Sequence, residues 1–280
     1  MVVMTEFIGL DSLILAALRE DIGTGDITTL SCVPADARSK GRFVAKQDGV
    51  ICGSFIPERV YGLLGGDVTV TLCVGDGDKV KKGDIIATLE GNSRQMLTGE
   101  RIALNFFQHM SGVATQTFEA VQQISGTGTK IIDTRKTTPG LRELEKYAVR
   151  TGGGSNHRFG LSDGVLIKDN HIKAAGGIAA AVNAARSLAP HTLKIEVETE
   201  SLEQVAEALE AGADIIMLDN MSPAQMAEAV LLINGRALTE ASGNMGERNL
   251  NEVAKTGVDF ISIGALTHTV RALDISLKFE

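Results

Sequence analysis

The stretch LKIEVETESLEQVAEALEAGADIIMLDN, residues 193–220, decides the fold class. Its apolar run at 193–198 predicts a strand, residues 201–211 have the spacing of an amphipathic helix, and 214–218 predict a second strand. The same alternation recurs, with further strands predicted at 130–133, 164–168, 236–240 and 259–264 and further helices at 177–188 and 222–232. Near-continuous apolar strands that alternate with helices predict an α/β fold with a parallel sheet covered by helices on its outer face.

Polar residues stand at or just after the end of each predicted strand, and this placement favours a barrel over an open sheet. They are Asp133–Lys136, Lys168–Asn170, Glu196 and Glu198, Asp219 and Asn220, Glu240–Gly243, and Gly264. In a β/α barrel the loops after all strands open onto one face and share one site. An open dinucleotide-binding sheet would carry a GxGxxG sequence after its first strand, and none is present.

The first hundred residues have a different pattern. Residues 10–20 have helical spacing, and short strands between Gly and Asp turns are predicted at 42–45, 49–53, 68–72 and 84–89. A long helix over 99–124 is expected to lead from this α+β part into the barrel. The last residues, 271–280, predict either a strand or a helix that returns to the first part.

Residues 75–91, GDGDKVKKGDIIATLEG, resemble the half-barrel of biotinyl and lipoyl carrier domains. A carrier presents its modified lysine in a hairpin, but Gly91-Asn92-Ser93 follows the strand here. We therefore interpret the segment as tight turns in a small sheet.

The bulk composition is that of a globular protein with a reduced interior. The chain has 280 residues, is 44% hydrophobic and 22% charged, and contains no apolar run long enough to cross a membrane. Its first 25 residues contain Glu6, Asp11, Glu20 and Asp21, whereas a signal peptide would have basic residues followed by an apolar stretch. Its three cysteines lack the spacing of a metal site, so we expect a cytoplasmic protein without structural disulfides.

The charge is unevenly distributed. The net charge of −8 argues against nucleic acid as a partner, yet residues 133–173 carry eight Lys/Arg against five Asp/Glu, a local charge of +3. This segment contains DTRKTTPGLR (133–142), GGGSNHR (152–158) and KDNH (168–171). Glycines let a backbone approach a ligand, and Arg and Lys bind carboxylate and phosphate, so the segment predicts a pocket for a small anion.

These runs, with EDIGTGDITT (20–29), KYAVR (146–150), LIKDNH (166–171), LDN (218–220) and GALTH (264–268), resemble the quinolinate phosphoribosyltransferase family over nearly the whole chain. The resemblance implies an N-terminal α/β sandwich over 1–112, joined by 271–280, and an incomplete β/α barrel over 113–270. It also implies transfer of phosphoribosyl from phosphoribosyl pyrophosphate to quinolinate with loss of CO₂, giving nicotinate mononucleotide in NAD biosynthesis. A homodimer or larger homo-oligomer is expected, in which Arg101 reaches the neighbouring active site.

The resemblance also implies roles for individual side chains. Quinolinate would be bound by Arg101, Arg135, His157, Arg158 and Lys168, and Lys136 would lie between quinolinate and the phosphoribosyl group. Several converging donors suit a small acid with two adjacent carboxylates. Glu198 and Asp219 match the acids of the site. As carboxylates they suit Mg²⁺, and they could equally contact ribose or the positive charge that develops on it.

The phosphate is expected at Ser242, Gly243, Asn244, Gly264, Ala265 and His268, which follow the last two predicted strands. The family most often has Gly where Asn244 stands. Because Asn tolerates positive φ better than most residues, the loop geometry is expected to survive. His109, His171 and His191 are interpreted as structural or surface residues.

Three alternatives differ in testable ways. A relative associated with molybdenum transport shares the barrel, but the EDIGTGDITT, NHR and ALTH sequences argue against it. A nicotinate phosphoribosyltransferase would release no CO₂. A carrier module built on residues 75–91 would carry biotin or lipoate.

Overall fold

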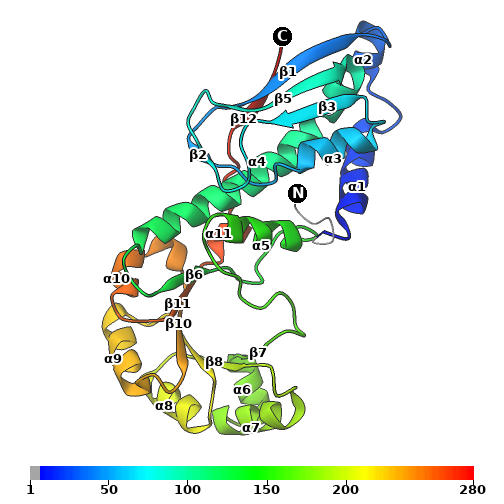
Figure 1. The fold of residues 1–280 in the computed structure, drawn as a ribbon. Coiled ribbons are helices and arrows are strands. Elements are labelled where there is room, and N and C mark those ends of the chain that lie inside the picture. The colour runs from blue at the N-terminus through cyan, green and yellow to red at the C-terminus, as the bar shows by residue number, and fades with distance from the viewer. Residues whose placement is uncertain (1–6) are drawn as a thin grey trace. The chain divides into compact units, whose positions relative to one another are not determined.

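The computed structural model describes residues 7–280, and the first six residues of the predicted domain 1–112 lie outside this range. The chain divides into two compact units (Figure 1). The first contains residues up to Gln116 together with Pro139–Gly152 and Val270–Glu280, and the second contains Thr117–Thr138 and Gly153–Thr269. The unit boundaries differ from the predicted domains chiefly in the segment 139–152, which the sequence analogy assigns to the barrel.

The second unit is built on a parallel sheet of six strands. Along the sheet the order is β6-β11-β10-β9-β8-β7, and every neighbouring pair is parallel. The strands are β6 (Lys130–Ile132), β7 (Val165–Ile167), β8 (Ile195–Thr199), β9 (Ile215–Asp219), β10 (Leu238–Ser242) and β11 (Phe260–Ser262). Each lies within a strand predicted from the sequence or extends it by one or two residues.

The barrel is incomplete, as expected, and its opening lies between β6 and β7. These two strands form the edges of the sheet, and within the described range no ladder joins them. The segment after Gly153 crosses this side of the sheet with a single parallel bridge between Ser155 and Ile132.

The helices that follow the strands cover the outer face of this sheet (Figure 1). They are α6 (Asp169–Ala175), α7 (Ile178–Leu188), α8 (Leu202–Glu210), α9 (Pro223–Ile233) and α10 (Leu250–Ala254), while the short helices η1 (Met245–Glu247) and α11 (Ala265–His268) follow β10 and β11. Helix α8 shows why they form. The Ser201 hydroxyl accepts the Gln204 N–H at its start, and Val205 and Ala208 are buried on one face.

The first unit contains an antiparallel sheet packed against helices. Its order is β12-β1-β5-β3, with β1 (Arg38–Ala45), β3 (Val68–Leu72), β5 (Ile85–Asn92) and β12 (Ile275–Phe279), and a separate pair joins β2 (Gly49–Val50) to β4 (Lys79–Val80). Helices α1 (Leu10–Ile22), α2 (Ile27–Cys32), α3 (Ile56–Leu63), α5 (Arg142–Thr151) and the first part of α4 (Ser93–Gln123) complete it. Phe43 of β1 meets Phe107 of α4 edge-to-face at 6.3 Å, and both side chains are fully buried.

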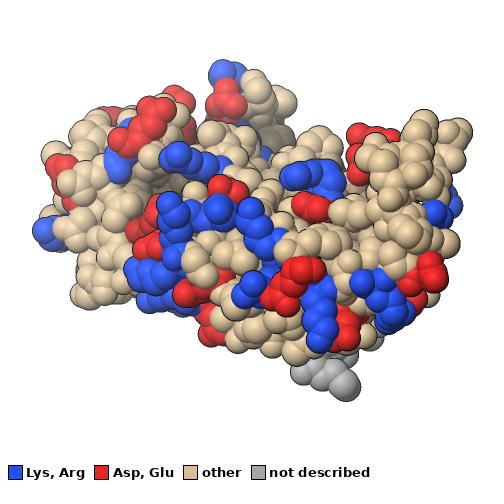
Figure 2. Space-filling model, turned by 90° about the horizontal axis from the view of Figure 1, so that it is seen from above, with Lys and Arg blue, Asp and Glu red and all other residues tan. Residues whose placement is uncertain are grey.

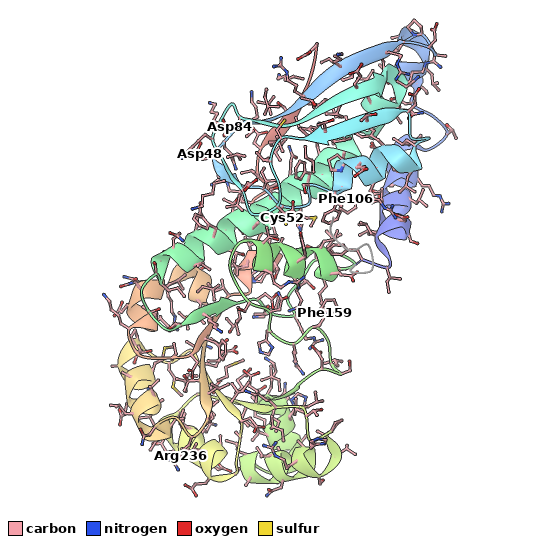
Figure 3. All side chains as sticks on the ribbon, in the orientation of Figure 1. Asp48, Cys52, Asp84, Phe106, Phe159 and Arg236 are labelled. Carbon is pink, nitrogen blue, oxygen red and sulfur yellow. The ribbon has the colours of Figure 1, made fainter. Side chains whose placement is uncertain are left out.

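The residues that resembled a carrier domain form tight turns beside this sheet. The Asp78 carboxylate accepts the Gly75 N–H at 2.8 Å, and the Asp84 carboxylate accepts the Lys81 N–H at 2.7 Å. Asp48 and Asp84 lie at the same end of the sheet (Figure 3), where Lys81 pairs with Asp48 at 2.8 Å. Local carboxylate hydrogen bonds thus account for the Asp and Gly in this stretch.

Helix α5 belongs to the first unit because its buried polar side chains have partners there. Glu145 is fully buried and lies 2.8 Å from the His109 ring on α4. The Tyr147 hydroxyl donates to Asp76 at 2.8 Å. The apolar face of an amphipathic helix could pack against either unit, so these polar contacts decide to which unit α5 belongs.

Two helical glycines provide a stability test of the first unit. A Cβ on Gly112 of α4 would lie 2.4 Å from the Arg271 carbonyl oxygen, whereas a Cβ on Gly62 of α3 would meet nothing within 4 Å. Gly112→Ala is expected to lower the free energy of unfolding by about 1–3 kcal/mol through overpacking. Gly62→Ala should raise it by about 0.5–1 kcal/mol, since Ala is the better helix former. Denaturant titration measures both, and equal effects would contradict the packing at Arg271.

Candidate active site

A cavity of about 400 Å³ lies at the carboxyl ends of the strands of the second unit. Its walls come from strands β7, β8, β9, β10 and β11, from the segments after β6 and β7, and from the loop 157–158. The lining residues are Thr134, Arg135, Lys136, His157, Arg158, Leu166, Lys168, Glu198, Met217, Asp219, Glu240, Ser242 and Ser262. The structure thus brings together Arg135, Lys136, His157, Arg158, Lys168, Glu198, Asp219 and Ser242, as the sequence predicts.

A buried aspartate organises the side of this cavity next to the opening of the barrel. Asp133 is fully buried, and its carboxylate accepts the His157 N–H at 2.9 Å and the Asn156 amide at 2.5 Å. The neighbouring Lys136 is held through its backbone, because its carbonyl accepts the Thr267 hydroxyl at 2.8 Å. The segment after β6 is therefore joined to the loop 156–158 through Asp133 and to helix α11 through the backbone of Lys136.

The cations of the cavity are close enough to affect one another. Burial lowers the pKa of Arg158, the positive charge of Arg135 lowers it further, and Glu196 and Asp163 raise it. Arg158 also donates to the Gly164 carbonyl at 2.9 Å. Lys168 lies 2.8 Å from Glu198, whose side chain is only 14% exposed. The site therefore holds several positive charges with two carboxylates, Glu198 and Asp219, at the ends of adjacent strands.

A His/Glu/Glu group borders the same cavity. The His157 Nε2 atom lies 3.1 Å from a Glu196 oxygen and 3.6 Å from a Glu240 oxygen, and both carboxyl side chains are nearly completely buried. Among residues 7–280 this is the one group of three His, Cys, Asp or Glu residues whose ligand atoms lie within 4.8 Å of one another. Neither Glu196 Oε1 nor Glu240 Oε1 has a hydrogen-bond partner.

Burial, followed by the negative charge of Glu196, raises the pKa of Glu240 well above its ordinary value. Hydrogen bonding to Ser262 opposes this shift. Glu240 therefore favours its neutral form beneath a site that is otherwise rich in charges.

The region expected to bind phosphate has the backbone geometry of an anion loop. Gly243 has φ 94°, and a Cβ there would lie 2.2 Å from the Asn220 amide oxygen, so only glycine fits. Asn244 has φ 52° and ψ 31°, a left-handed conformation that Asn tolerates, as expected from the sequence. A Cβ on Gly264 would lie 3.1 Å from both the His268 ring and the Lys136 side chain.

Other predicted residues lie outside the cavity wall. Gly243, Asn244, Gly264, Ala265 and His268 do not line the cavity, although Gly243 follows Ser242 directly and Gly264 lies beside Lys136. Arg101 is exposed on α4 in the first unit. His171 has a structural role, because its Nδ1 accepts the Lys168 N–H at the start of α6.

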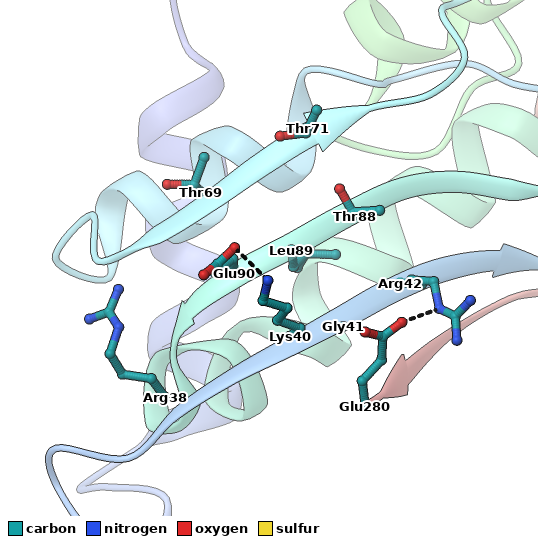
Figure 4. Close-up of a pocket in the computed structure, with 10 residues that line it drawn as sticks. All are labelled: Arg38, Lys40, Gly41, Arg42, Thr69, Thr71, Thr88, Leu89, Glu90 and Glu280. Carbon is teal, nitrogen blue, oxygen red and sulfur yellow. Dashed lines mark ion pairs between the residues drawn. The ribbon is translucent and has the colours of Figure 1, made fainter.

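A larger hollow of about 520 Å³ lies on the outer face of the first unit's sheet (Figure 4). Its basic residues are paired: Lys40 lies 3.4 Å from Glu90, and Arg42 lies 2.8 Å from Glu280. Figure 2 likewise shows basic and acidic side chains intermixed over one face of the molecule. Arg38, the third basic residue of the hollow, pairs with Asp67 at 2.9 Å, so each of the three has an acidic partner.

Family models match both parts of the chain. The model described as the C-terminal domain of quinolinate phosphoribosyl transferase matches residues 113–278, and the model of its N-terminal domain matches 26–111. The chain belongs to the quinolinate phosphoribosyltransferase family. The resemblance carried by the sequence motifs is thereby confirmed, and the carrier-domain alternative is excluded.

Individual relatives agree with the family. A probable nicotinate-nucleotide pyrophosphorylase (carboxylating) of Bacillus subtilis is 49% identical, covering 92% of this chain and 89% of that protein. A solved nicotinate-nucleotide pyrophosphorylase of Ehrlichia chaffeensis is 40% identical with a TM-score of 0.93, covering 98% of this chain and 99% of that chain. Human nicotinic acid phosphoribosyltransferase has a TM-score of 0.63 at 13% identity, covering 95% of this chain and 73% of that chain, which is a likeness of fold alone.

Three contributors to the site were not assigned a role from the sequence: Asp133, Glu196 and Glu240. All are buried acids in or after barrel strands. The signal that could have revealed them is an acid at an inward position of an otherwise apolar strand, where burial requires a partner.

The shifted pKa of Glu240 has a consequence for stability. Because the folded pKa is raised, the unfolded chain loses this proton first as pH rises above about 4.3, and stability then falls up to the folded pKa. Glu240→Gln removes this loss. Its free energy of unfolding should exceed that of the wild type at pH 7 and match it near pH 4.

Denaturant unfolding at a series of pH values tests this expectation. The exposed Glu210 provides a matched control, and Glu210→Gln should follow the wild-type pH dependence. If the free energy of unfolding of the wild type exceeded that of Glu240→Gln by an amount that grows with pH, Glu240 would be ionised in the folded protein.

Proposed function

We propose that the protein transfers the phosphoribosyl group of phosphoribosyl pyrophosphate to quinolinate and releases CO₂, giving nicotinate mononucleotide and pyrophosphate for de novo NAD biosynthesis. One observation carries this proposal: four basic side chains and two strand-end carboxylates line a single cavity of a family member's barrel. The basic residues are Arg135, Lys136, Arg158 and Lys168. They suit a substrate with two adjacent carboxylates and a second substrate rich in phosphate.

Quinolinate is assigned to the side of the cavity formed by Arg135, His157, Arg158 and Lys168. Arg135 and Arg158 lie close enough to lower the pKa of Arg158, and a bound dianion would relieve this repulsion. Lys136, fixed by Thr267 and next to Gly264, is assigned to the boundary between quinolinate and the phosphoribosyl group.

The 5′-phosphate of the second substrate is assigned to the loops after β10 and β11. This assignment rests on the positive φ of Gly243 and Asn244 and on the position of Gly264 before α11. Backbone N–H groups at the ends of the last barrel strands commonly bind phosphate. Ser242, Ala265 and His268 complete the proposed phosphate site.

Mg²⁺ is proposed as the cofactor, held by Glu198 and Asp219 together with the pyrophosphate group. Both acids line the cavity as hard oxygen donors, and Mg²⁺ commonly binds through one or two carboxylates plus substrate phosphates. When bound, the ion neutralises the departing pyrophosphate. Because Glu198 already pairs with Lys168, metal binding would free Lys168 to face the substrate carboxylate.

The reaction needs no side-chain nucleophile. The pyridine nitrogen of quinolinate attacks C1 of the ribose as pyrophosphate leaves, with Glu198 and Asp219 close to the positive charge that develops on the sugar. The positive nitrogen of the resulting pyridinium stabilises the electron pair left on C2 when the 2-carboxylate departs as CO₂, and C2 then takes up a proton from solvent. Positioning and charge stabilisation supply the acceleration.

A homodimer is proposed because the first unit presents an exposed arginine near exposed apolar side chains. Arg101 is exposed on α4, and Ile27 and Leu30 of α2 are 76% and 54% exposed. Helix α2 is tied to α4 by the Thr98 hydroxyl, which donates to Asp26. A second copy would cover these residues and receive Arg101 in its active site.

The protein is further proposed to act in the cytoplasm without nucleic-acid or membrane partners. Cys32, Cys52 and Cys73 are all free thiols, as a reducing compartment allows. In the part of the chain that the structure describes, no helix has the length and apolarity to cross a membrane.

Turnover of quinolinate tests the proposed function. Incubation with quinolinate, phosphoribosyl pyrophosphate and Mg²⁺ should produce nicotinate mononucleotide and CO₂ in equal amounts, and chelation of Mg²⁺ should stop both. Arg135→Ala should lower kcat/KM by about 100-fold or more through loss of a charged donor, with an unchanged circular dichroism spectrum. Product without CO₂ from nicotinate would favour the nicotinate enzyme, and no product at all would favour the molybdenum-associated relative.

Complementation tests the role of Arg101. Arg101→Ala and Lys136→Ala should each be inactive alone, yet coexpressed chains should recover about a quarter of wild-type activity. Half of the randomly paired dimers are mixed, and each mixed dimer has one site with both residues intact. No recovery from dimers of mixed composition would show that Arg101 does not act in the neighbouring site.

A further inference from the structure

The layer formed by His157, Glu196 and Glu240 separates two cavities of the second unit. Besides the active-site cavity there is a second one of about 300 Å³, lined by the apolar residues Ile132, Ile215 and Phe260 and by polar residues that include Glu196. His157, Arg158 and Glu240 line both cavities. These three side chains therefore face the active site as well as the second cavity.

Both nitrogens of the His157 ring are engaged within the protein. Its Nδ1 accepts the Arg158 backbone N–H at 2.6 Å, so the ring proton lies on Nε2. Nε2 then donates to Glu196 at 3.1 Å, with Glu240 at 3.6 Å. In this arrangement the ring holds the backbone of Arg158.

We propose that Glu196 and Glu240 are positioning residues: the carboxyl pair holds the His157 ring, and the ring in turn fixes Arg158 for the carboxylates of the substrate. This inference rests on the proposed function, because it assigns Arg158 to quinolinate. It extends the site by Glu196 and Glu240, which act on the substrate through His157 and Arg158.

The chemistry of the layer supports a positioning role over a metal site. A metal ion would need the lone pair of Nε2, but that atom carries the proton while Nδ1 accepts from Arg158. Two buried carboxyls this close cannot both be charged without a compensating cation. The raised pKa of Glu240 means that this carboxyl keeps its proton and is neutral. A neutral Glu240 can donate to Glu196, which leaves one negative charge facing Arg158.

Three variants separate the geometry of Glu240 from its charge. Glu240→Gln keeps the size and a donor, Glu240→Leu keeps the size alone, and Glu210→Gln is an exposed control. We expect Glu240→Leu to raise KM for quinolinate about tenfold while KM for phosphoribosyl pyrophosphate stays within about twofold. Glu240→Gln should restore quinolinate KM to within about twofold of the wild type.

Equal losses in Glu240→Gln and Glu240→Leu, or a parallel rise in both KM values, would overturn the proposal. So would a wild-type increase in melting temperature with MnCl₂ or ZnCl₂ that Glu240→Gln abolishes, since the group would then be a metal site. Circular dichroism of each variant identifies a loss of fold.

Nitrogen NMR of the histidine rings makes the test independent of turnover. With His157 assigned through His157→Gln, long-range ¹H–¹⁵N spectra should show the Nε2–H tautomer in the wild type and in Glu240→Gln, and a mixture in Glu240→Leu. The Nδ1–H tautomer in the wild type would overturn the proposal. If the tautomers behave as expected but the wild type does not bind quinolinate, the layer stands as described and the proposed function fails.

Discussion

The hydrogen bonds of Asp133 are the constraint on which the site depends. The barrel is open between β6 and β7, and only the bridge between Ser155 and Ile132 joins the sheet to the segment that crosses this side. The buried Asp133 carboxylate adds the contacts to Asn156 and to the His157 N–H. Without a paired strand, these side-chain hydrogen bonds define where the loop 156–158 stands. A buried carboxylate is costly unless several donors surround it, so the loop and the aspartate require each other.

The opening of the barrel also explains where the two arginines meet. Arg135 follows the edge strand β6, while Arg158 comes from the loop that crosses the opening. A closed barrel would place a paired strand and its regular side-chain alternation here. The irregular loop instead allows His157 and Arg158 to take positions set by local hydrogen bonds, including that from Arg158 to Gly164. Arg158 is therefore restrained next to Arg135 before a ligand arrives.

Most of the fold could be predicted from the sequence because its signals are local. The strands and helices of 193–220 follow from apolar periodicity and from the Ser201 cap, and the residues after each strand could be assigned to one face once a barrel was inferred. Helix α4 starts at Ser93, six residues before the predicted start. The prediction missed this part because the first turn lacks the apolar spacing of the remainder. Contacts between residues far apart in the sequence were harder to predict. Glu145 pairs with His109, so α5 joins the first unit, and no local pattern announces that pairing. The meeting of Glu196 with Glu240 is likewise a consequence of tertiary structure, since one strand separates β8 from β10 in the sheet.

The contact between Glu196 and Glu240 matters because two negative charges next to the active site would weaken anion binding. The active-site cavity is lined by four cations and two strand-end carboxylates, and its substrates carry further charge. If Glu196 and Glu240 were both ionised beneath it, their field would weaken the attraction of Arg135 and Arg158 for an anion. A proton retained on Glu240 removes one of these charges, while the other stays opposite Arg158. The burial that raises the pKa of Glu240 thus costs stability at neutral pH and at the same time preserves the positive potential of the site. Local destabilisation of this kind is common where a structure is arranged for binding instead of for maximal stability.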